Sequence, residues 1–176
     1  MSARHAPHGG SGDSIGGLAF GLLTVSDTRQ SRDDVSGRVL RELVSAAGHR
    51  VFAVAIVPDE PARVREQVLT WVQEPACDVV LSTGGTGLSA RDRTVEAVSE
   101  LFDVCIDGFG ELFRVLSFEA IGSRAMLSRA TAGVIGGTPV FLLPGSPEAV
   151  TLALTRLVLP ELGHLIGELR RQGRRS

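Results

Sequence analysis

The sequence predicts a layered α/β fold, and two patterns carry this prediction. Apolar runs of strand length alternate along the chain with amphipathic stretches of helical period. The first run, at 18–25, is apolar almost throughout, as expected of a strand that is covered on both faces. With 176 residues, 43% of them hydrophobic, the chain is long enough to bury one core. We expect one domain at 17–168, between a disordered tail at 1–16 and a basic tail at 169–176.

The first half of the chain predicts three strands, at 18–25, 51–57 and 79–81. Asp33 and Asp34 offer an N-cap for the helix after the first strand, and Gly48 ends that helix. A break at 58–61, Pro-Asp-Glu-Pro, follows the second strand and opens a second helix. The inward face of this helix is expected to consist of Val64, Val68, Leu69 and Val72.

The second half predicts two helices, one more strand and a long final helix. Thr94 is the expected N-cap of a brief helix. A loop beginning at 108–110 leads into further helix, indicated by Phe113, Leu116 and Ile121. The run at 139–143 is a strand, and Ser146-Pro147-Glu148 follows it as N-cap, first residue and acidic first turn of the long helix. We expect that helix to break at Pro160.

Composition and charge exclude several classes of protein. Eighteen basic groups against twenty acidic ones give a net charge of −2, so bulk electrostatics give no case for binding nucleic acid. All the basic residues are arginine, and without lysine the chain has neither a P-loop lysine nor a Schiff-base lysine. No stretch reaches the roughly 20 apolar residues of a membrane helix, and the first fourteen residues lack the apolar segment of a secretion signal.

The cysteines and the terminal histidines are expected to have no chemical role. Cys77 and Cys105 are predicted to be small buried hydrophobic side chains, which fits a reducing cytoplasm. His5 and His8 lie in the expected tail, where we predict them to be solvated rather than bound to a metal. We therefore expect a cytoplasmic protein with neither a nucleic-acid nor a membrane partner.

Three polar or glycine-rich turns follow predicted strands, at Ser26-Asp27, at 83–87 and at Pro144-Gly145-Ser146. In an open α/β sheet, ligands collect at the carboxyl ends of the strands. Glycines let the backbone approach a ligand closely, so that its amides can cradle anionic oxygens. The turn at 83–87, Thr-Gly-Gly-Thr-Gly, therefore suits a phosphate, although such a turn is more often only a tight connection.

Two carboxylates near these turns have alternative interpretations. Asp92 suits Mg²⁺ together with substrate phosphates, while Arg91 and Arg93 suit the phosphate itself; equally, Asp92 is an ion-pair partner of the two arginines. Local sequence alone favours Asp59 as the N-cap of the helix that follows it. Ser146 is an N-cap first and an anion contact second, and the two roles are compatible. The sequence has neither a Gly-x-Ser-x-Gly nucleophile elbow nor a cysteine with an activating histidine nearby, so covalent hydrolase chemistry is not expected.

An ordered set of motifs resembles the MoaB/MogA family of molybdenum cofactor biosynthesis proteins. These motifs are Thr83-Gly-Gly-Thr-Gly87, Arg91-Asp92, Gly108-Phe-Gly-Glu111, Met126-Leu-Ser-Arg129 and Leu143-Pro-Gly-Ser-Pro147. The resemblance runs from about residue 18 to residue 165. It implies a three-layer α/β/α sandwich with a mostly parallel sheet, assembled as a homotrimer or homohexamer. Many members have proline after the Thr94 position, where this chain has Val95, a change expected to affect helix preorganisation but not chemistry.

The resemblance also implies a reaction and a site. Active members bind Mg-ATP and molybdopterin, and they transfer AMP to the pterin's terminal phosphate with release of pyrophosphate. It places the two essential carboxylates, which hold Mg²⁺, on Asp59 and Asp92, against the local preference for Asp59 as a cap. The implied nucleotide- and pterin-binding residues are Ser26, Asp27, Thr83, Gly84, Gly85, Thr86, Gly87, Arg91, Ser128, Arg129, Pro144, Gly145 and Ser146.

Two other functions stay open for such a sequence. Some members of the MoaB branch are thought to be inactive, so the alternative is a non-catalytic, oligomeric molybdopterin-binding homologue. A nicotinamide-nucleotide deamidase of the CinA type has a related domain, but Thr86-Gly87 stands where a Leu-Gly-Pro-Thr run is expected, which disfavours that function.

Overall fold

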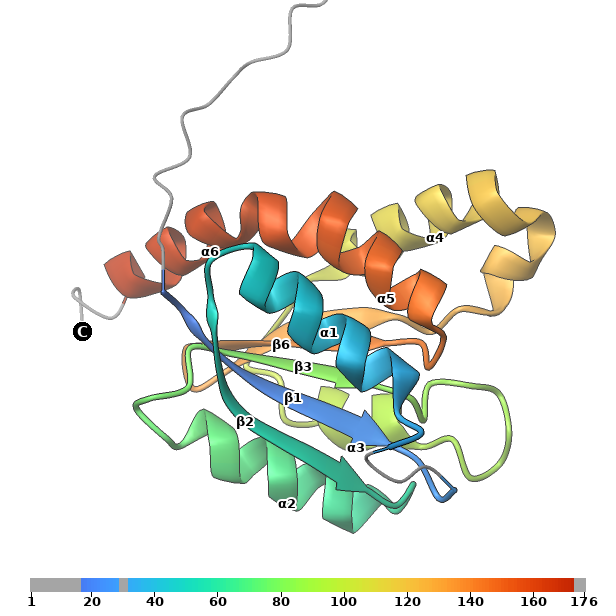
Figure 1. The fold of residues 1–176 in the computed structure, drawn as a ribbon, viewed down its shortest axis with the longest axis horizontal. Helices are drawn as coiled ribbons and strands as arrows, with labels where there is room; N and C mark the ends of the chain where they lie inside the picture. Colours follow the sequence, from blue (N-terminus) through green and yellow to red (C-terminus); the bar gives the residue numbers. More distant parts are fainter. Residues whose placement is uncertain (1–16, 29–31, 173–176) are drawn as a thin grey trace, which may run out of the picture.

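The computed structural model describes residues 17–28 and 32–172, and it has one sheet between two layers of helices (Figure 1). The expected tail at 1–16, with His5 and His8, lies outside the described residues, as do residues 173–176.

The sheet has six strands in the order β2-β1-β3-β6-β5-β4. The strands are β1 (Ala19–Val25), β2 (Arg50–Val57), β3 (Val79–Thr83), β4 (Val104–Cys105), β5 (Thr131–Ile135) and β6 (Thr138–Leu143). Neighbours among β2, β1, β3 and β6 run parallel, whereas β5 is antiparallel to both β6 and β4. The expected α/β class with a mostly parallel sheet is confirmed.

The helices divide between the two faces of the sheet, and each face has its own core. The helices are α1 (Val35–Ala46), α2 (Pro61–Val72), α3 (Thr94–Ser99), α4 (Asp107–Ile121), α5 (Pro147–Ala153) and α6 (Leu159–Gln172), with a 3-10 turn η1 (Gly122–Leu127) and a π-helical turn η2 (Leu154–Val158). One core joins α1, α4, α5 and α6 to the sheet, and the other joins α2 and α3 to it (Figure 1). This arrangement is the expected three-layer sandwich.

A buried carboxylate ties α1 to the sheet. Asp34 is the N-cap, as one of the two predicted candidates, and its Oδ1 accepts from Gly37 N at 2.9 Å. Its Oδ2 accepts a hydrogen bond of 2.7 Å from the hydroxyl of Thr24 on β1. The cap therefore fixes the start of α1 over the carboxyl end of β1, where the functional turns begin.

The packing of α2 departs from the expected face. Val64 and Val68 are buried, but Leu69 and Val72 are only partly buried, and Trp71 occupies the core instead. A Cβ added to Gly21 on β1 would lie 2.5 Å from the Trp71 ring, so the indole lies directly on the glycine backbone. A helical pattern shows which residues are apolar, but it does not show the space that a glycine leaves on the opposing strand.

Two expectations between residues 94 and 110 are wrong in detail. Thr94 is the first residue of α3 rather than its cap, which is Arg93. The expected loop at 108–110 is the first turn of α4, because Phe109 packs in the core against Phe141 with ring centroids 5.2 Å apart. The further helix indicated by Phe113, Leu116 and Ile121 is present, and Ile121, at its end, is 56% exposed.

The antiparallel edge of the sheet was not predicted. β4 has only two residues, and β5 is joined to β6 by Gly136 and Gly137, both at positive φ. Cys77 is buried, as expected, but Cys105 on β4 is exposed, because this short strand lies at the end of the sheet. Strands as short as β4 do not produce a recognisable apolar run.

The final helix does not break at Pro160. It is continuous over Pro147–Arg171, and the wider π turn at η2 comes just before the proline. Proline lacks the N–H for the bond to the fourth preceding carbonyl, and its ring would clash there, so the wider turn accommodates it. By length and composition this helix is apolar enough to cross a membrane, contrary to our expectation, but Val150, Leu154 and Leu162 lie in the core.

The folded domain extends past its expected end at residue 168. α6 continues to Gln172, and Arg170 donates to Asp78 Oδ1 at 3.1 Å.

Candidate functional site

The predicted turns meet at the carboxyl end of the parallel strands. In the register of the sheet, Thr24 lies beside Thr83, and Thr83 beside Leu143. On the other side of β1, Val25 lies beside Val57, directly before Pro58 and Asp59. The turns after β1, β2, β3 and β6 are therefore neighbours, as expected for a ligand site at this edge.

The glycine-rich loop after β3 is fixed tightly against its neighbours. Gly84 and Gly85 have φ of 98° and 65°, conformations that side chains rarely adopt. A Cβ on Gly84 would lie 2.2 Å from the Val25 carbonyl oxygen. The Thr83 hydroxyl donates to the Pro144 carbonyl at 2.8 Å, and Gly84 N donates to the Leu143 carbonyl at 3.1 Å. The loop at 83–87 and the turn at 144–146 therefore form one rigid unit.

Three carboxylates gather on one side of this loop. Asp27 Oδ1 accepts a 2.8 Å hydrogen bond from Asp59 N, which positions the turn after β2 against the turn after β1. Burial, followed by hydrogen bonding and charge repulsion from Asp92 and by repulsion from Asp27, raises the pKa of Asp59 to about 6, against the lowering effect of Arg91. The two carboxylates that the resemblance singled out thus lie close enough for the charge of Asp92 to act on Asp59. Asp59 does not cap α2, whose N-cap is Glu60.

Two buried oxygens without partners converge on Gly85. A Cβ at this glycine would lie 2.9 Å from Asp59 Oδ1 and 2.1 Å from Thr94 Oγ1. Both atoms are buried, and within the described part of the chain neither has a hydrogen-bond partner. Burying polar oxygens unpaired is unfavourable, and such atoms in native proteins commonly mark functional positions. From the sequence, Thr94 was expected only to cap a helix, and this contact was not predicted.

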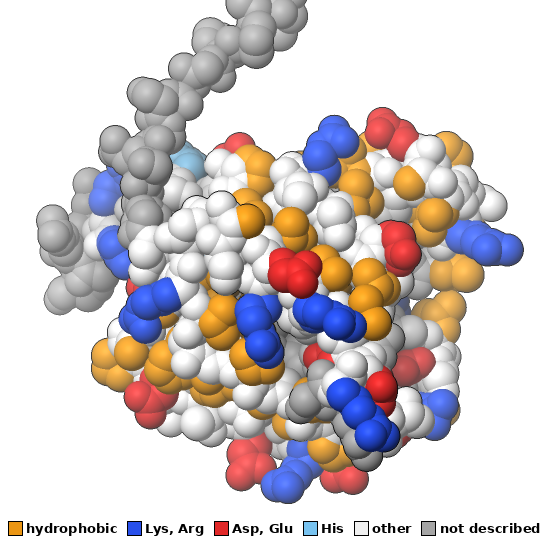
Figure 2. All heavy atoms as spheres, in the orientation of Figure 1, with side chains coloured by type: hydrophobic (Ala, Val, Ile, Leu, Met, Phe, Trp, Pro, Cys, Tyr) orange, Lys and Arg blue, Asp and Glu red, His pale blue; other side chains and the backbone are white. Residues whose placement is uncertain are grey.

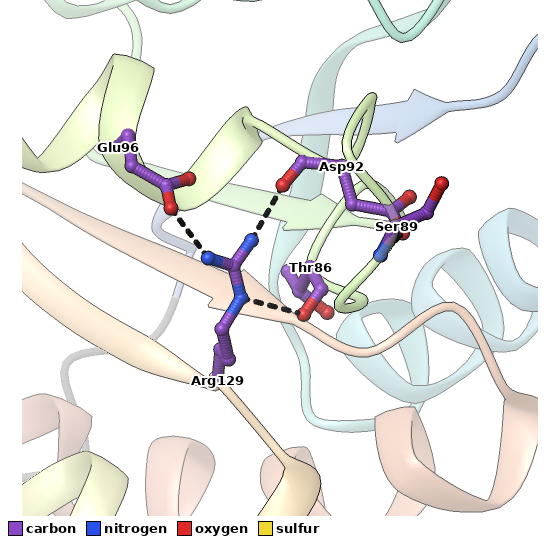
Figure 3. Close-up of polar contacts among 5 residues, drawn as sticks. All are labelled: Thr86, Ser89, Asp92, Glu96 and Arg129. Carbon is purple, nitrogen blue, oxygen red and sulfur yellow. Dashed lines mark hydrogen bonds and ion pairs between the residues drawn. The ribbon is translucent and has the colours of Figure 1, made fainter.

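Arg129 clamps the loop that carries Asp92 (Figure 3). Its Nε donates to the Thr86 carbonyl at 3.2 Å, and its two terminal nitrogens donate to the Asp92 carbonyl and to Glu96. The hydrogen bond from Arg129 to the Glu96 carboxylate holds the pKa of Glu96 below its usual value. The Asp92 carboxylate instead accepts from Ser89 N at 2.8 Å. Arg129, predicted as a ligand contact, thus directs its guanidinium at the protein's own loop.

Arg91 has the exposure expected of an anion contact. Its side chain is 74% exposed, and its nearest carboxylate contact is with Asp27 at 3.9 Å. Among the described residues, Asp92 forms no ion pair with Arg91 or Arg93, so the structure does not support the local ion-pair interpretation of Asp92.

A cavity of about 370 Å³ opens on the other side of the glycine loop. Eight of the predicted residues line it together with neighbours from the helical layer. The predicted ones are Gly84, Gly85, Thr86, Gly87, Ser128, Pro144, Gly145 and Ser146. Phe113 and Ser117 of α4 and Arg124 of η1 complete the wall, and sequence reasoning missed all three. Ser146 caps α5, its Oγ accepting from Ala149 N at 3.2 Å, so the expected cap is confirmed.

The predicted residues therefore form two groups that share the glycine loop. Asp59 and Asp92 contact it at Gly85 and Gly87, and the cavity lies along the same loop. Ser26 and Asp27 belong to the carboxylate side: Ser26 Oγ accepts from Thr28 N at 3.4 Å, and neither residue lines the cavity.

Comparison with known families decides what kind of domain carries this site. The model of a family described as a probable molybdopterin binding domain matches residues 21–164. The chain belongs to this family.

Relatives of similar length share this sequence. A protein of Bacillus cereus called molybdenum cofactor biosynthesis protein B is 52% identical over 152 residues, covering 86% of this chain and 90% of that protein. The protein of the same name in Bacillus subtilis is 47% identical over 151 residues, covering 85% and 89%. The similarity therefore spans nearly the whole of both chains.

Solved structures of this family have the same fold. A crystal structure of a molybdenum cofactor biosynthesis protein B superposes with a TM-score of 0.86 at 50% identity, covering 88% of this chain and 97% of that one. The tungsten cofactor synthesizing protein MoaB of Pyrococcus furiosus gives 0.79 at 36% identity, covering 88% and 98%. The expected resemblance to MoaB and MogA is confirmed.

One further contact in this domain was not predicted. Ser36, in the first turn of α1, donates its hydroxyl to the Gly145 carbonyl at 2.8 Å. The residue is fully buried and connects α1 to the turn after β6. Its only signal in the sequence is its position just after the Asp34 cap, and that signal does not identify its partner 109 residues away.

Proposed function

We propose that this chain acts in molybdenum cofactor biosynthesis by transferring AMP from ATP to the terminal phosphate of molybdopterin. The observation that carries the proposal is that Asp59 and Asp92 lie against Gly85 and Gly87 of the glycine loop, which also lines the cavity. The names of the relatives support the pathway, and the family description supports the pterin. The pair of carboxylates supports the transfer, because two anionic substrates need a cation between them.

The carboxylate pair fits Mg²⁺. Asp59 Oδ1 is buried without a hydrogen bond, and the raised pKa of Asp59 reflects unfavourable burial of a negative charge, which a cation would relieve. No group of three or more His, Cys, Asp or Glu side chains stands ready for a metal in the described ranges, and Mg²⁺ commonly takes one or two carboxylates, with phosphate and water oxygens as the other ligands. When bound, Mg²⁺ neutralises charge on the phosphates as it develops.

The proposed reaction requires the protein to position its two substrates rather than to form a covalent bond with either of them. An oxygen of the pterin phosphate forms the bond to the α-phosphorus of ATP, and the bond from that phosphorus to the bridging oxygen of pyrophosphate breaks. Backbone amides of the glycine loop and the exposed guanidinium of Arg91 bind phosphate oxygens, and Ser128 and Ser146 offer hydroxyls at the cavity wall. No covalent nucleophile is required; burial raises the pKa of Cys77 and leaves that thiol unreactive.

The chain is proposed to work as a homotrimer or homohexamer in the cytoplasm. The outer side of α4 and η1 exposes apolar side chains: Leu112, Val115, Phe118, Ile121, Met126 and Leu127. A cluster of this kind is typical of a protein interface. Ile121 and Leu127 also line the cavity, so a neighbouring copy docked on this cluster would border the site. Val115→Glu should dissociate the assembly, as sedimentation velocity would show, while Glu119→Lys on the same helix serves as the charge-change control.

The transfer is tested by mixing purified protein with molybdopterin, ATP and Mg²⁺ and measuring pyrophosphate. Asp92→Asn retains an oxygen for the hydrogen bond from Ser89 N but removes the charge, so we expect transfer to be abolished and thermal stability to be retained. Asp33→Asn, an exposed carboxylate paired with Arg32, is the matched control and should be fully active. Binding of the pterin without pyrophosphate release by the wild type would instead support the non-catalytic carrier.

A further inference from the structure

The outer edge of the sheet at β2 has one irregularity, at Phe52, where the pairing with β1 shifts register, and residues 53–57 beyond it pair regularly. β2 pairs with β1 alone among the described strands, so alternate N–H and C=O groups point outward along its length. From residue 51 to 57 the strand reads Val-Phe-Ala-Val-Ala-Ile-Val, with neither a charge nor a proline. Proteins usually guard an edge strand with charges, prolines or bulges, because a bare apolar edge pairs readily with another strand. The edge therefore has the properties of a docking surface.

A basic hollow runs beside this edge, under α1. It has a volume of about 230 Å³; Val54 and Ile56 of β2 provide apolar lining, and Arg38 and Arg41 of α1 provide charge. Val54 is 42% exposed. Figure 2 shows basic side chains gathered along the side of α1 that faces β2, with hydrophobic side chains next to them.

Three arginines line this hollow: Arg32 pairs with Asp33 at 3.3 Å, whereas the other two have no ion pair within the described part of the chain. Arg38 and Arg41 are exposed and three residues apart, so they lie on one side of α1, and neither forms an ion pair there. Asp34, which also lines the hollow, uses both carboxylate oxygens for Thr24 and Gly37. Two guanidinium groups without an ion pair therefore lie beside an apolar strand, where they can bind an anion. A guanidinium group binds a carboxylate through two parallel hydrogen bonds.

We propose that an extended acidic segment of another protein docks here, adding to β2 as a seventh strand. Its backbone pairs with the free edge, and every second side chain points to the α1 side of the sheet. Acidic residues at those positions place their aliphatic stems along Val54 and Ile56 and their carboxylates at Arg38 and Arg41. A second copy of the chain is a poorer occupant, because antiparallel pairing of two β2 edges places the arginines of both α1 helices on the same face. This surface is separate from the glycine loop and does not depend on the transfer reaction.

The test uses a fluorescein-labelled nonapeptide of alternating Glu and Val and the full-length protein, with binding followed by fluorescence anisotropy. Exposed ion pairs are individually weak, so Arg38→Ala with Arg41→Ala should lower the affinity about tenfold. Arg156→Ala, an exposed arginine of η2, is the matched control and should leave the affinity unchanged. The same peptide with all of its backbone nitrogens methylated has no N–H donor on either edge and cannot pair with a strand, so it should also bind at least about tenfold more weakly.

Two further measurements can refute the proposal. A peptide of alternating Lys and Val should not bind; equal binding of both peptides, or no effect of the double substitution, would refute the proposal. Val54→Lys adds charge to the edge and should abolish peptide binding with the oligomeric state unchanged in sedimentation velocity. If this substitution instead dissociates the assembly and the wild type does not bind the acidic peptide, the β2 edge pairs with a second copy of the chain.

Discussion

Arg129 holds Asp92 by its main chain rather than by its carboxylate. The guanidinium donates to the Asp92 carbonyl and, at 3.2 Å, to the Thr86 carbonyl, so that two points of the loop around residues 83–94 are fixed by one side chain (Figure 3). The negative charge of Asp92 is thereby left beside Asp59. A single arginine from the segment before β5 thus positions the Asp92 carboxylate without neutralising its charge.

This relationship predicts that lysine cannot replace Arg129. A lysine keeps the charge, but its one nitrogen cannot reach three fixed acceptors at once. Leaving a buried carbonyl unpaired costs ~2 kcal/mol, which corresponds to a fall in melting temperature of ~4–8 °C for a chain of this size. We expect Arg129→Lys to show this fall in calorimetry and to raise the KM for ATP. Arg114→Lys, which alters a single 3.5 Å contact with the Ala130 carbonyl, is the control and should change little.

Gly85 is predicted to tolerate no side chain. Alanine there would adopt an unfavourable positive φ and place its Cβ 2.1 Å from Thr94 Oγ1. The left-handed conformation alone costs ~1–2 kcal/mol, so Gly85→Ala should lower the melting temperature by several degrees and eliminate transfer. Gly167→Ala in α6 should have the opposite effect and raise the melting temperature. Nothing lies within 4 Å of its added Cβ, and alanine stabilises a helix by ~1 kcal/mol relative to glycine. A stable, active Gly85→Ala protein would contradict the described contact of Asp59 with Gly85.

The hydroxyl of Thr94 is predicted to reduce stability. It is buried without a partner, so Thr94→Val, which keeps the shape, should raise the melting temperature in the absence of ligands. The same change should slow transfer, because the hydroxyl lies against the same glycine as Asp59. Thr24→Val provides the contrast: that hydroxyl donates to buried Asp34 at 2.7 Å, and its loss should destabilise the protein. Destabilisation of similar size in both variants would show that Thr94 is paired after all.

The raised pKa of Asp59 predicts a pH-dependent stability. Because the native carboxyl, with a pKa of about 6, holds its proton more tightly than an unfolded one, the native state loses stability as the pH rises from about 4 through 6. In EDTA, Asp59→Asn should therefore melt higher than the wild type at pH 7.5, and the difference should shrink toward pH 4.5. Adding Mg²⁺ at pH 7.5 should raise the melting temperature of the wild type alone. Parallel curves for both proteins across this pH range would be inconsistent with a buried, charge-crowded Asp59.

Much of the parallel half of the fold was predictable, because each strand there is a distinct apolar run followed by a polar or glycine turn. The turns at Ser26, Gly84 and Gly145 met as expected, since parallel strands place their carboxyl ends at one edge. The antiparallel half was not predictable in this way. β4 and β5 are short, and α4 begins at residues that resemble a glycine-rich loop.

The site was predictable where a residue lies within a turn, and not where a distant element contacts that turn. Ser117 and Arg124 reach the cavity from α4 and η1, and no local pattern marks them as anything but helix surface. Arg129 was predicted to touch ligand, but its geometry shows a guanidinium directed at two loop carbonyls and Glu96. Distinguishing a ligand contact from a loop clamp needs the direction of the side chain, and sequence does not provide it.

Trp71 is an intrinsic fluorescence probe of the fold. It is the sole tryptophan in a chain without tyrosine, and it is 5% exposed where α2 packs on Gly21 of β1. Intrinsic emission excited at the indole therefore follows the α2 side of the sheet only, on the face opposite α1 and α4. Unfolding curves read from this emission can be compared with those from circular dichroism, and a mismatch would reveal that the two layers melt separately.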